Sequence, residues 1–428
     1  MAMFNHVDAI EVRIWNKLVG AVSPDHRHGA YAFEYAPAWI KRGVELAPLT
    51  MPLAEARQPF LFPHLREDTY KRLPGLLADA LPDDFGSALI DAYMATRGVD
   101  RNQITSLDRL AYMGRRGMGA LEFHPARGIT RDRSGPLQMA ELVRVARDVL
   151  HGDLTDDTHS KEALASIIRV GTSAGGARAK AVVAFNPETR ELRSGQFHTA
   201  TGFEHWLIKF DGLGEDTELG QSQAHGRIEY AYYLMATAAG ITMSECRLLH
   251  ENGRRHFMTK RFDRDGNSKH HMQTLCGLDH IDYKMRDTNS YEQLFLAMNR
   301  LGLDLEARQQ AFRRMVFNWL AWNCDDHSKN HSFLLREEGA WELSPAYDIT
   351  FAHNPDGYWT RHHLMSVAGK FDGADRADFM KVADVFQIAD ASAIMKDVQQ
   401  AVAQWTDFAR QADVPPKETG HIASYLLA

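Results

Sequence analysis

A polar stretch between two apolar segments constrains the fold of this chain more than any other feature. It runs from Asn323 to Asn330 and contains two adjacent aspartates. Before it, apolar residues recur at helical spacing from Phe312 to Leu320, and after it the segment Ser332 to Leu335 has the composition of a short buried strand. The polar stretch is therefore predicted to be a loop that joins a buried helix to a buried strand.

The spacing of the polar residues in this loop points to phosphoryl transfer. Asp325 and Asn330 stand in the Asp-x-x-x-x-Asn spacing of a kinase catalytic loop, where the aspartate is the base for the acceptor hydroxyl and the asparagine holds Mg²⁺. Asp348 is predicted to supply the second metal ligand, since carboxylate and amide oxygens suit this hard cation. The predicted catalytic residues are Asp325, Asn330 and Asp348.

A zinc site is the competing interpretation of the same loop. His327 and His331 are four residues apart, so the two imidazoles would converge on a metal if they shared a helix face. The segment from Asp325 to Lys329 has loop character, and His331 begins an apolar strand. This arrangement disfavours zinc and gives His327 a role in supporting the loop.

Length and composition limit the classes of protein to consider. With 428 residues the chain is expected to form two or three domains. No apolar run approaches the roughly 20 residues that span a bilayer, and the N-terminus lacks the apolar core of a signal peptide, so a cytoplasmic location is expected. Three scattered cysteines argue against a disulfide framework, and the net charge of -7 argues against a general nucleic-acid surface.

Three parts of the chain differ in their pattern of apolar residues. Residues 9–35 alternate between apolar and polar, which predicts a small antiparallel sheet within an N-terminal accessory subdomain of residues 1–130. Residues 131–264 are predicted to form a β-rich lobe, and residues 265–428 an α-helical lobe. The predicted fold class is α+β, with two lobes in the order found in protein kinases.

The same patterns predict the individual elements. Helices are expected at residues 137–150, 161–168, 222–240, 291–298, 305–322, 377–386, 391–409 and 416–427, with short helices within 73–95. Strands are expected at residues 179–185, 196–199, 205–210, 247–250 and 255–262.

Three upstream features suit a nucleotide. The small residues of the segment Gly171 to Arg178 would let backbone N–H groups approach phosphates, although a plain flexible connector would look the same. Lys209 ends a buried strand and could bind the α and β phosphates, or it could be an edge lysine with its charge in water. Glu229, on the next helix, could hold Lys209 in place.

The chain resembles the HipA family, the serine/threonine kinase toxins of bacterial HipBA toxin–antitoxin modules. The matching motifs occur in one order along nearly the whole chain. They are Tyr35 to Trp39, Leu49 to Leu53, Leu81 to Asp83, Ser173 to Lys180, Leu207 to Lys209, Arg261 to Arg264, Asp325 to Asn330 and Pro345 to Ile349.

This resemblance implies ATP and Mg²⁺ as cofactors and a protein substrate. The implied substrate is an aminoacyl-tRNA synthetase such as glutamyl-tRNA synthetase, whose modification inhibits translation. The implied partner is a HipB-like helix-turn-helix antitoxin, through which the complex would reach DNA. The ATP-binding residues it implies are Ser173, Ala174, Gly175, Gly176, Ala177, Lys180, Lys209, Glu229 and Phe262.

By the same resemblance Ser173 is the site of autophosphorylation. A phosphate there would place nearly two negative charges in a loop meant for ATP phosphates, which favours an ejected loop and an inactive enzyme. The chain departs from the family pattern at Lys260, where a glutamate is common before Arg261-Phe262-Asp263.

Two other functions remain open from the sequence. A small-molecule kinase of the same fold would carry a similar loop, although an accessory subdomain of about 130 residues suits a protein target better. A non-catalytic nucleotide-binding partner of a DNA-binding antitoxin would not need Lys209, Asp325, Asn330 and Asp348 together. The sequence therefore favours the protein kinase.

Overall fold

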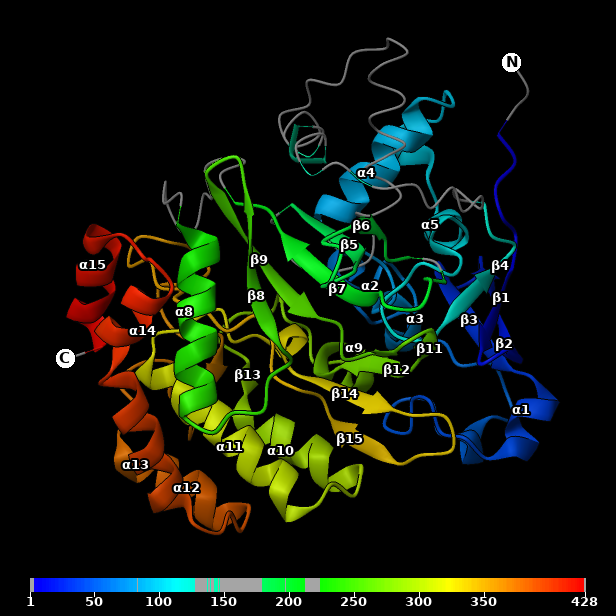
Figure 1. Ribbon diagram of the computed structural model, residues 1–428. Coiled ribbons are helices and arrows are strands. Elements are labelled where there is room, and N and C mark those ends of the chain that lie inside the picture. Colours follow the sequence, from blue (N-terminus) through cyan, green and yellow to red (C-terminus); the bar gives the residue numbers. More distant parts are fainter. Residues whose placement is uncertain are drawn as a thin grey trace.

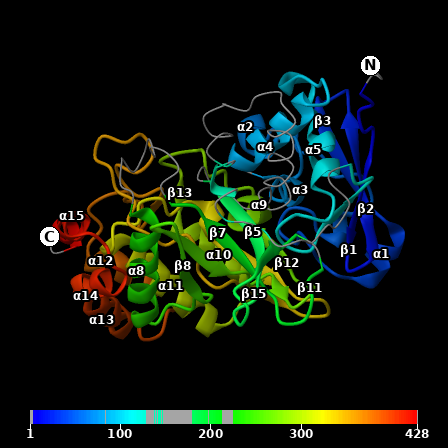
Figure 2. The same cartoon turned by 45° about the horizontal axis from the view of Figure 1, so that its top comes forward.

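The computed structural model describes residues 4–82, 84–127, 179–196, 198–211 and 224–426, with a few further positions between 137 and 146. The chain consists of an N-terminal subdomain, a sheet lobe and a helical lobe (Figure 1). Figures 1 and 2 both place the N-terminal subdomain and the C-terminal helices at opposite ends of the molecule. Within the described residues, no helix is both long and apolar enough to cross a membrane.

The N-terminal subdomain is built on the antiparallel sheet that the alternating pattern predicts. Its strands are β1 (Ile10–Ile14), β2 (Lys17–Asp25), β3 (Ala30–Tyr35) and β4 (Glu122–His124), in the order β3-β2-β1-β4. Strand β4 was not predicted, because its pairing with β1 joins Val12 to Phe123 across more than a hundred residues. The helices are α1 (Pro37–Arg42), α2 (Glu67–Tyr70), α3 (Gly75–Ala78), α4 (Asp84–Ala95) and α5 (Ser106–Met113).

The sheet lobe is an antiparallel sheet covered by one described helix. Its strands are β5 (Lys180–Phe185), β6 (Leu192–Ser194), β7 (Glu204–Lys209), β8 (Cys246–Glu251) and β9 (Arg254–Lys260), in the order β6-β5-β7-β9-β8. Helix α8 (His225–Ala238) packs on β8 and β9. The prediction of a strand at 196–199 was wrong. The strand that follows β5 is β6, which begins earlier, at Leu192, because Leu192 pairs with Phe185 directly after the turn between them.

The helical lobe follows the predicted helices closely. The helices of this lobe are α9 (Leu275–Asp279), which was not predicted, α10 (Tyr291–Arg300), α11 (Leu305–Leu320), α12 (Arg376–Val385), α13 (Ala391–Val402), α14 (Trp405–Gln411) and α15 (Pro416–Leu426). Asp304 caps α11 by accepting the N–H of Ala307. The single helix predicted at 391–409 is broken after α13, and the break lets Trp405 pack against Tyr232 of α8, with ring centroids 5.3 Å apart.

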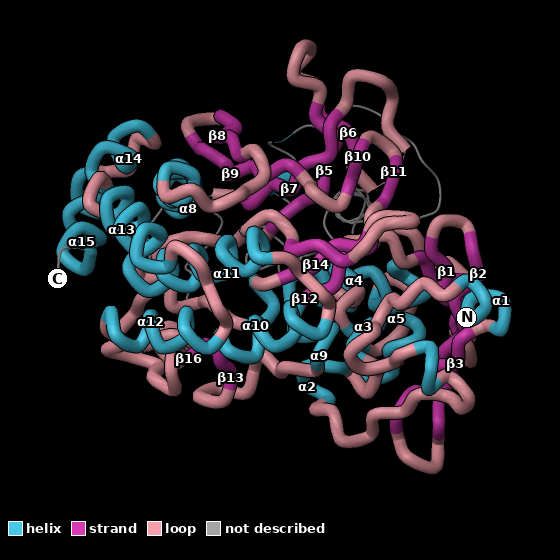
Figure 3. The backbone as a smooth tube through the Cα atoms, turned by 90° about the horizontal axis from the view of Figure 1, so that it is seen from below, coloured by secondary structure: helices cyan, strands magenta, loops and turns pink. Residues whose placement is uncertain are grey.

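Most of the strands inside the helical lobe were not predicted. Strands β12 (His271–Thr274), β14 (Ser332–Leu335) and β15 (Trp341–Leu343) form a sheet of order β12-β14-β15, seen from below beside α9 and α10 in Figure 3. Strands β13 (Asn289–Ser290) and β16 (Met365–Ser366) pair in parallel. Only the strand at 332–335 was expected, because the others are short and find their partners far along the chain.

A buried group of charges joins the N-terminal subdomain to the end of the sheet lobe. The Asp263 carboxylate is fully buried and accepts hydrogen bonds from the Arg261 and Arg264 guanidiniums and from the Gly119 N–H at 2.7 Å. Arg264 also donates to the carbonyls of Gly119 and Gly117. Burial alone would raise the pKa of Asp263, but the two arginines outweigh it and hold the pKa below its usual value.

Several predicted elements lie outside the described residues. These are the helices expected at 161–168 and most of 137–150, the loop from Gly171 to Arg178 with Ser173, Ala174, Gly175, Gly176 and Ala177, and the first residues of the helix expected at 222–240.

We predict that Asp263→Asn lowers the free energy of unfolding by about 3 kcal/mol at neutral pH, because it leaves two buried arginines without a counter-charge. Since the folded-state pKa of Asp263 lies below that of the unfolded chain, its contribution is complete above about pH 4 and is lost as the pH falls further. Urea unfolding at several pH values measures both effects. The exposed Asp265→Asn is the control, and equal stability of the two variants would contradict the prediction.

Candidate functional site

The predicted catalytic loop lies between α11 and β14, as the sequence indicated. Its two aspartates differ in environment: the Asp325 side chain is 48% exposed, whereas that of Asp326 is fully buried. The Asn330 amide N–H donates to the Asp325 carbonyl at 2.8 Å, within a 3₁₀ turn of Ser328–Asn330. This bond fixes the Asn330 amide and leaves its oxygen as the acceptor atom. The loop thus presents one carboxylate to solvent beside one oriented amide.

Asp326 anchors the loop to the helical lobe. Its carboxylate accepts hydrogen bonds from the Tyr291 hydroxyl at 2.8 Å, from His363 Nδ1 at 3.0 Å and from the Leu364 N–H at 2.8 Å. The His363 ring stacks on Trp319 of α11, with centroids 4.1 Å apart. Sequence analysis assigned no role to Asp326. The only sequence signal for this role was the position of Asp326 directly after Asp325, because the residues that contact it lie far away along the chain.

Lys209, Glu229 and Asp348 meet between the lobes. Lys209 Nζ lies 2.5 Å from Glu229 Oε1 and also contacts Asp348 Oδ1. Burial would lower the pKa of Lys209, but the charges of Asp348 and Glu229 raise it above its usual value. Burial alone would raise the pKa of Asp348, but the positive charges of Lys209 and Lys180 outweigh it and hold this pKa well below its usual range. Lys209 and Asp348 are therefore both charged at neutral pH.

The sheet lobe sets the positions of these groups. Lys180 of β5 pairs with Lys209 of β7 in the sheet register, which brings two lysines to the same end of the sheet. Glu229 is held by α8, which approaches β9 closely at Gly226: a Cβ there would lie 2.5 Å from the Arg255 carbonyl. The Tyr232 hydroxyl, one turn along α8, donates to the Ala321 carbonyl of the helical lobe at 2.7 Å. Helix α8 is thus fixed to both lobes.

Phe262 lies on the segment that leads from β9 into the helical lobe. Its ring is 5.7 Å from that of Tyr347, the residue before Asp348. The Tyr347 hydroxyl donates to the Lys329 carbonyl at 2.6 Å, so Phe262 is connected through one ring to both Asp348 and the catalytic loop. Lys260, which stands directly before the Arg261-Phe262-Asp263 motif, forms an ion pair with Glu204 at 2.5 Å.

The donor set at the site suits a hard cation bound together with phosphates. The described residues contain no cluster of three or more His, Cys, Asp or Glu side chains placed to hold a metal ion. Mg²⁺ does not require such a cluster, because it is commonly held by one or two protein oxygens and by phosphate oxygens of the substrate. The ionised Asp348 and the oriented Asn330 amide are donors of this kind.

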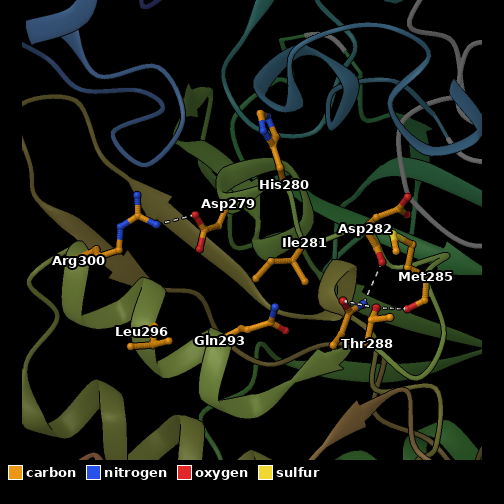
Figure 4. Close-up of a pocket in the computed structure, with 10 residues that line it drawn as sticks. Asp279, His280, Ile281, Asp282, Met285, Thr288, Gln293, Leu296 and Arg300 are labelled. Atoms are coloured by element: carbon orange, nitrogen blue, oxygen red, sulfur yellow. Dashed lines mark hydrogen bonds and ion pairs between the residues drawn. The ribbon is translucent and has the colours of Figure 1, made fainter. Parts of the chain in front are cut away.

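A separate cavity of about 470 Å³ lies between the segment 279–289 and α10. Its lining residues Asp279 and Arg300 form an ion pair at 2.7 Å on one side of it (Figure 4). The cavity adjoins the catalytic loop only through its wall, where the Ser328 hydroxyl donates to the Ile281 carbonyl at 2.6 Å. Lys209, Asp325 and Asp348 are not among its described lining residues. It is therefore distinct from the candidate site.

Comparison with known proteins covers nearly the whole chain. Residues 172–405, more than half of the chain, match the HipA-like C-terminal domain, and residues 10–124 match the HipA N-terminal domain. Among solved structures, the chain is similar to HipA in a complex of the Shewanella oneidensis MR-1 toxin–antitoxin proteins HipA and HipB with operator DNA. That likeness has a TM-score of 0.67 at 17% identity and covers 98% of this chain and 95% of that chain. It confirms the predicted α+β two-lobe fold with its N-terminal subdomain.

A slighter likeness involves the Helicobacter pylori proinflammatory kinase CtkA. It has a TM-score of 0.35 at 12% identity and covers 59% of this chain and 90% of that chain.

We predict that Asp326→Asn lowers the free energy of unfolding by about 2 kcal/mol, because a neutral amide cannot replace a buried carboxylate that accepts hydrogen bonds from three groups. Asp325→Asn, one residue earlier and half-exposed, is the matched control and is expected to change stability by less than about 0.5 kcal/mol. Chemical denaturation of both variants measures the difference. Equal stabilities would show that the Asp326 contacts do not hold the loop.

Proposed function

The chain belongs to the HipA family, and from this premise and the geometry of its site we propose that it is an ATP- and Mg²⁺-dependent protein serine/threonine kinase that acts as a toxin. The observation that carries the proposal is the meeting of Lys209, Glu229 and Asp348 beside the half-exposed Asp325. A lysine held by a helix glutamate, next to a metal-binding aspartate, is the arrangement that kinases use to bind ATP phosphates.

Each group has a role that its environment supports. Asp325, accessible on the loop, accepts the proton of the acceptor hydroxyl. Lys209 offsets the charge of the α and β phosphates, and Glu229 keeps it in place. Asn330 and Asp348 would hold Mg²⁺, which supplies further neutralisation of phosphate charge. Lys180 adds a second cation at the same end of the sheet, and Phe262, whose ring contacts that of Tyr347 beside Asp348, would lie near the nucleotide.

The loop Gly171 to Arg178 completes the proposal on sequence grounds. Its backbone N–H groups, at Ser173 to Ala177, would bind phosphates, and phosphorylation of Ser173 would switch the enzyme off by adding negative charge to that loop.

The proposed target is a host protein, with an aminoacyl-tRNA synthetase such as glutamyl-tRNA synthetase as the leading candidate, so that translation is inhibited. The proposed partner is a HipB-like antitoxin, and DNA would be reached through it. Support comes from family membership and from the structural neighbour, which was solved with HipB and operator DNA.

We predict that Asp325→Asn reduces phosphoryl transfer by at least about 100-fold while leaving ATP affinity nearly unchanged, because the lost group acts on the acceptor hydroxyl. The test incubates the protein with γ-labelled ATP and Mg²⁺, alone and with host lysate, and maps labelled peptides by mass spectrometry. Asp265→Asn serves as the control.

Label on Ser173 or on one lysate protein, dependent on Asp325, would support the protein kinase. Transfer that Asp325→Asn does not impair would refute the assignment of the base. Label on neither protein, with ATP still consumed in the presence of small metabolites, would favour a small-molecule kinase. Nucleotide binding without any transfer would favour a non-catalytic partner of the antitoxin.

We predict that Asp348→Asn removes most of the dependence of nucleotide binding on Mg²⁺, since the amide is a weaker ligand for a hard cation. Calorimetric titration with ADP, with and without Mg²⁺, measures this without any catalytic turnover. Asp265→Asn should retain the full Mg²⁺ effect. An unchanged Mg²⁺ effect in Asp348→Asn would exclude Asp348 as a ligand.

A further inference from the structure

Two lysines from distant parts of the chain converge on one carbonyl oxygen. Lys71 Nζ lies 3.0 Å and Lys284 Nζ lies 3.2 Å from the Asp68 backbone oxygen. Lys71 directly follows α2 in the N-terminal subdomain, and Lys284 belongs to the segment 279–289 of the helical lobe. A single carbonyl thus separates two positive charges on the surface where these parts meet.

The pair lacks a carboxylate partner among the described residues. No described Asp or Glu oxygen forms an ion pair with either ammonium group within 4.0 Å, and the Asp68 carboxylate instead lies 3.6 Å from Arg66. Partial burial and then the charge of Lys284 lower the pKa of Lys71. Bringing the two ammonium groups together therefore has a cost that a bound anion would remove.

The backbone holds the pair in this arrangement. Lys71 has a φ of 52° and Arg72 a φ of 63°, a left-handed backbone conformation that residues other than glycine seldom adopt. On the other side, Asp282 Oδ1 accepts both the Thr69 hydroxyl at 2.6 Å and the Lys284 N–H at 2.9 Å. Lys71 is the C-cap of α2, and the Asp282 contacts hold the two lysine backbones in place relative to one another.

The pair is connected to the catalytic loop by one aromatic ring. Lys284 Nζ lies 5.7 Å from the centroid of Tyr283, and Lys329 Nζ of the catalytic loop lies 5.0 Å from the same centroid. The His327 ring, 3.8 Å from Asp325 through its Nε2, is 5.1 Å from Tyr283. The Tyr283 ring thus lies between Lys284 of the pair and Lys329 of the catalytic loop.

We propose that Lys71 and Lys284 form a docking site for acidic side chains of the protein substrate, close in sequence to its acceptor serine or threonine. This rests on the proposed function, which it deepens by giving the substrate a charge preference. The site suits a short acidic segment better than a nucleic acid. Two lysines can pair with one or two carboxylates, whereas a nucleic acid would need a longer stretch of cations, and the nearby Glu67 and Asp68 are each held by an arginine, Arg72 at 2.7 Å and Arg66 at 3.6 Å.

The test measures binding by fluorescence anisotropy at low ionic strength. Three labelled probes are used: a short serine peptide flanked by glutamates, the same peptide with lysines in place of glutamates, and a short single-stranded RNA. The variants are the double changes Lys71→Ala with Lys284→Ala and Lys71→Arg with Lys284→Arg. The exposed lysines Lys381 and Lys396 of α12 and α13, changed to alanine, provide the matched control.

The wild type is expected to bind the acidic peptide more tightly than the other two probes. The alanine double variant should bind it about fivefold more weakly, because two exposed charge pairs are lost. The arginine variant, which keeps both charges, and the control should bind as the wild type does. Unchanged nucleotide affinity in the alanine variant would show that it is folded.

Three results would overturn the proposal: equal binding by the alanine variant, equal binding of acidic and basic peptides, or preference for the RNA. The Asp325→Asn variant separates this proposal from the proposed function. It should bind the acidic peptide as the wild type does although it transfers no phosphate. A chain that binds the acidic peptide through Lys71 and Lys284 but never phosphorylates a protein would refute the kinase and leave the docking site standing.

Discussion

The buried charges around Asp263 are the constraint on which the arrangement of the three parts depends. A carboxylate without contact to water is stable only with compensating charges and donors, and here these come from Arg261, Arg264 and the Gly119 backbone. The cluster therefore fixes the N-terminal subdomain at the point where the chain leaves β9. Phe262 lies inside this turn and contacts Tyr347, so the position of Asp348 follows from the same cluster.

Helix α8 imposes the second constraint, since it belongs to both lobes. One part of its surface packs on β8 and β9, while Ile228, Tyr232 and Met235 lie in the core of the helical lobe. Glu229 is buried between these contacts, and it determines where Lys209 lies. The ion pair between Lys209 and Glu229 thus depends on the relative position of the lobes. If α8 shifted, Lys209 would keep its contact with Asp348 and lose the one with Glu229.

The parts of the fold that could be predicted depend on local patterns. Helical spacing predicted α10, α11 and α15, alternation predicted β1 to β3, and the analogy with protein kinases suggested the pairing of Lys209 with Glu229. The strands β4, β12 and β15 were missed because their stability comes from partners far along the chain. Asp326 was overlooked for the same reason, since its role depends on Tyr291 and His363 and not on its neighbours.

The position of β4 has a consequence for how the chain folds during synthesis. The N-terminal sheet can close once residue 124 has left the ribosome, since β4 pairs with β1. Gly119 precedes that point, but its partner Asp263 is made about 140 residues later. The nascent subdomain can thus complete its sheet early, as N-terminal domains commonly do, and keeps the Gly117–Gly119 backbone groups in water until the sheet lobe emerges. Attachment of the two parts is therefore a late assembly step between pre-formed surfaces.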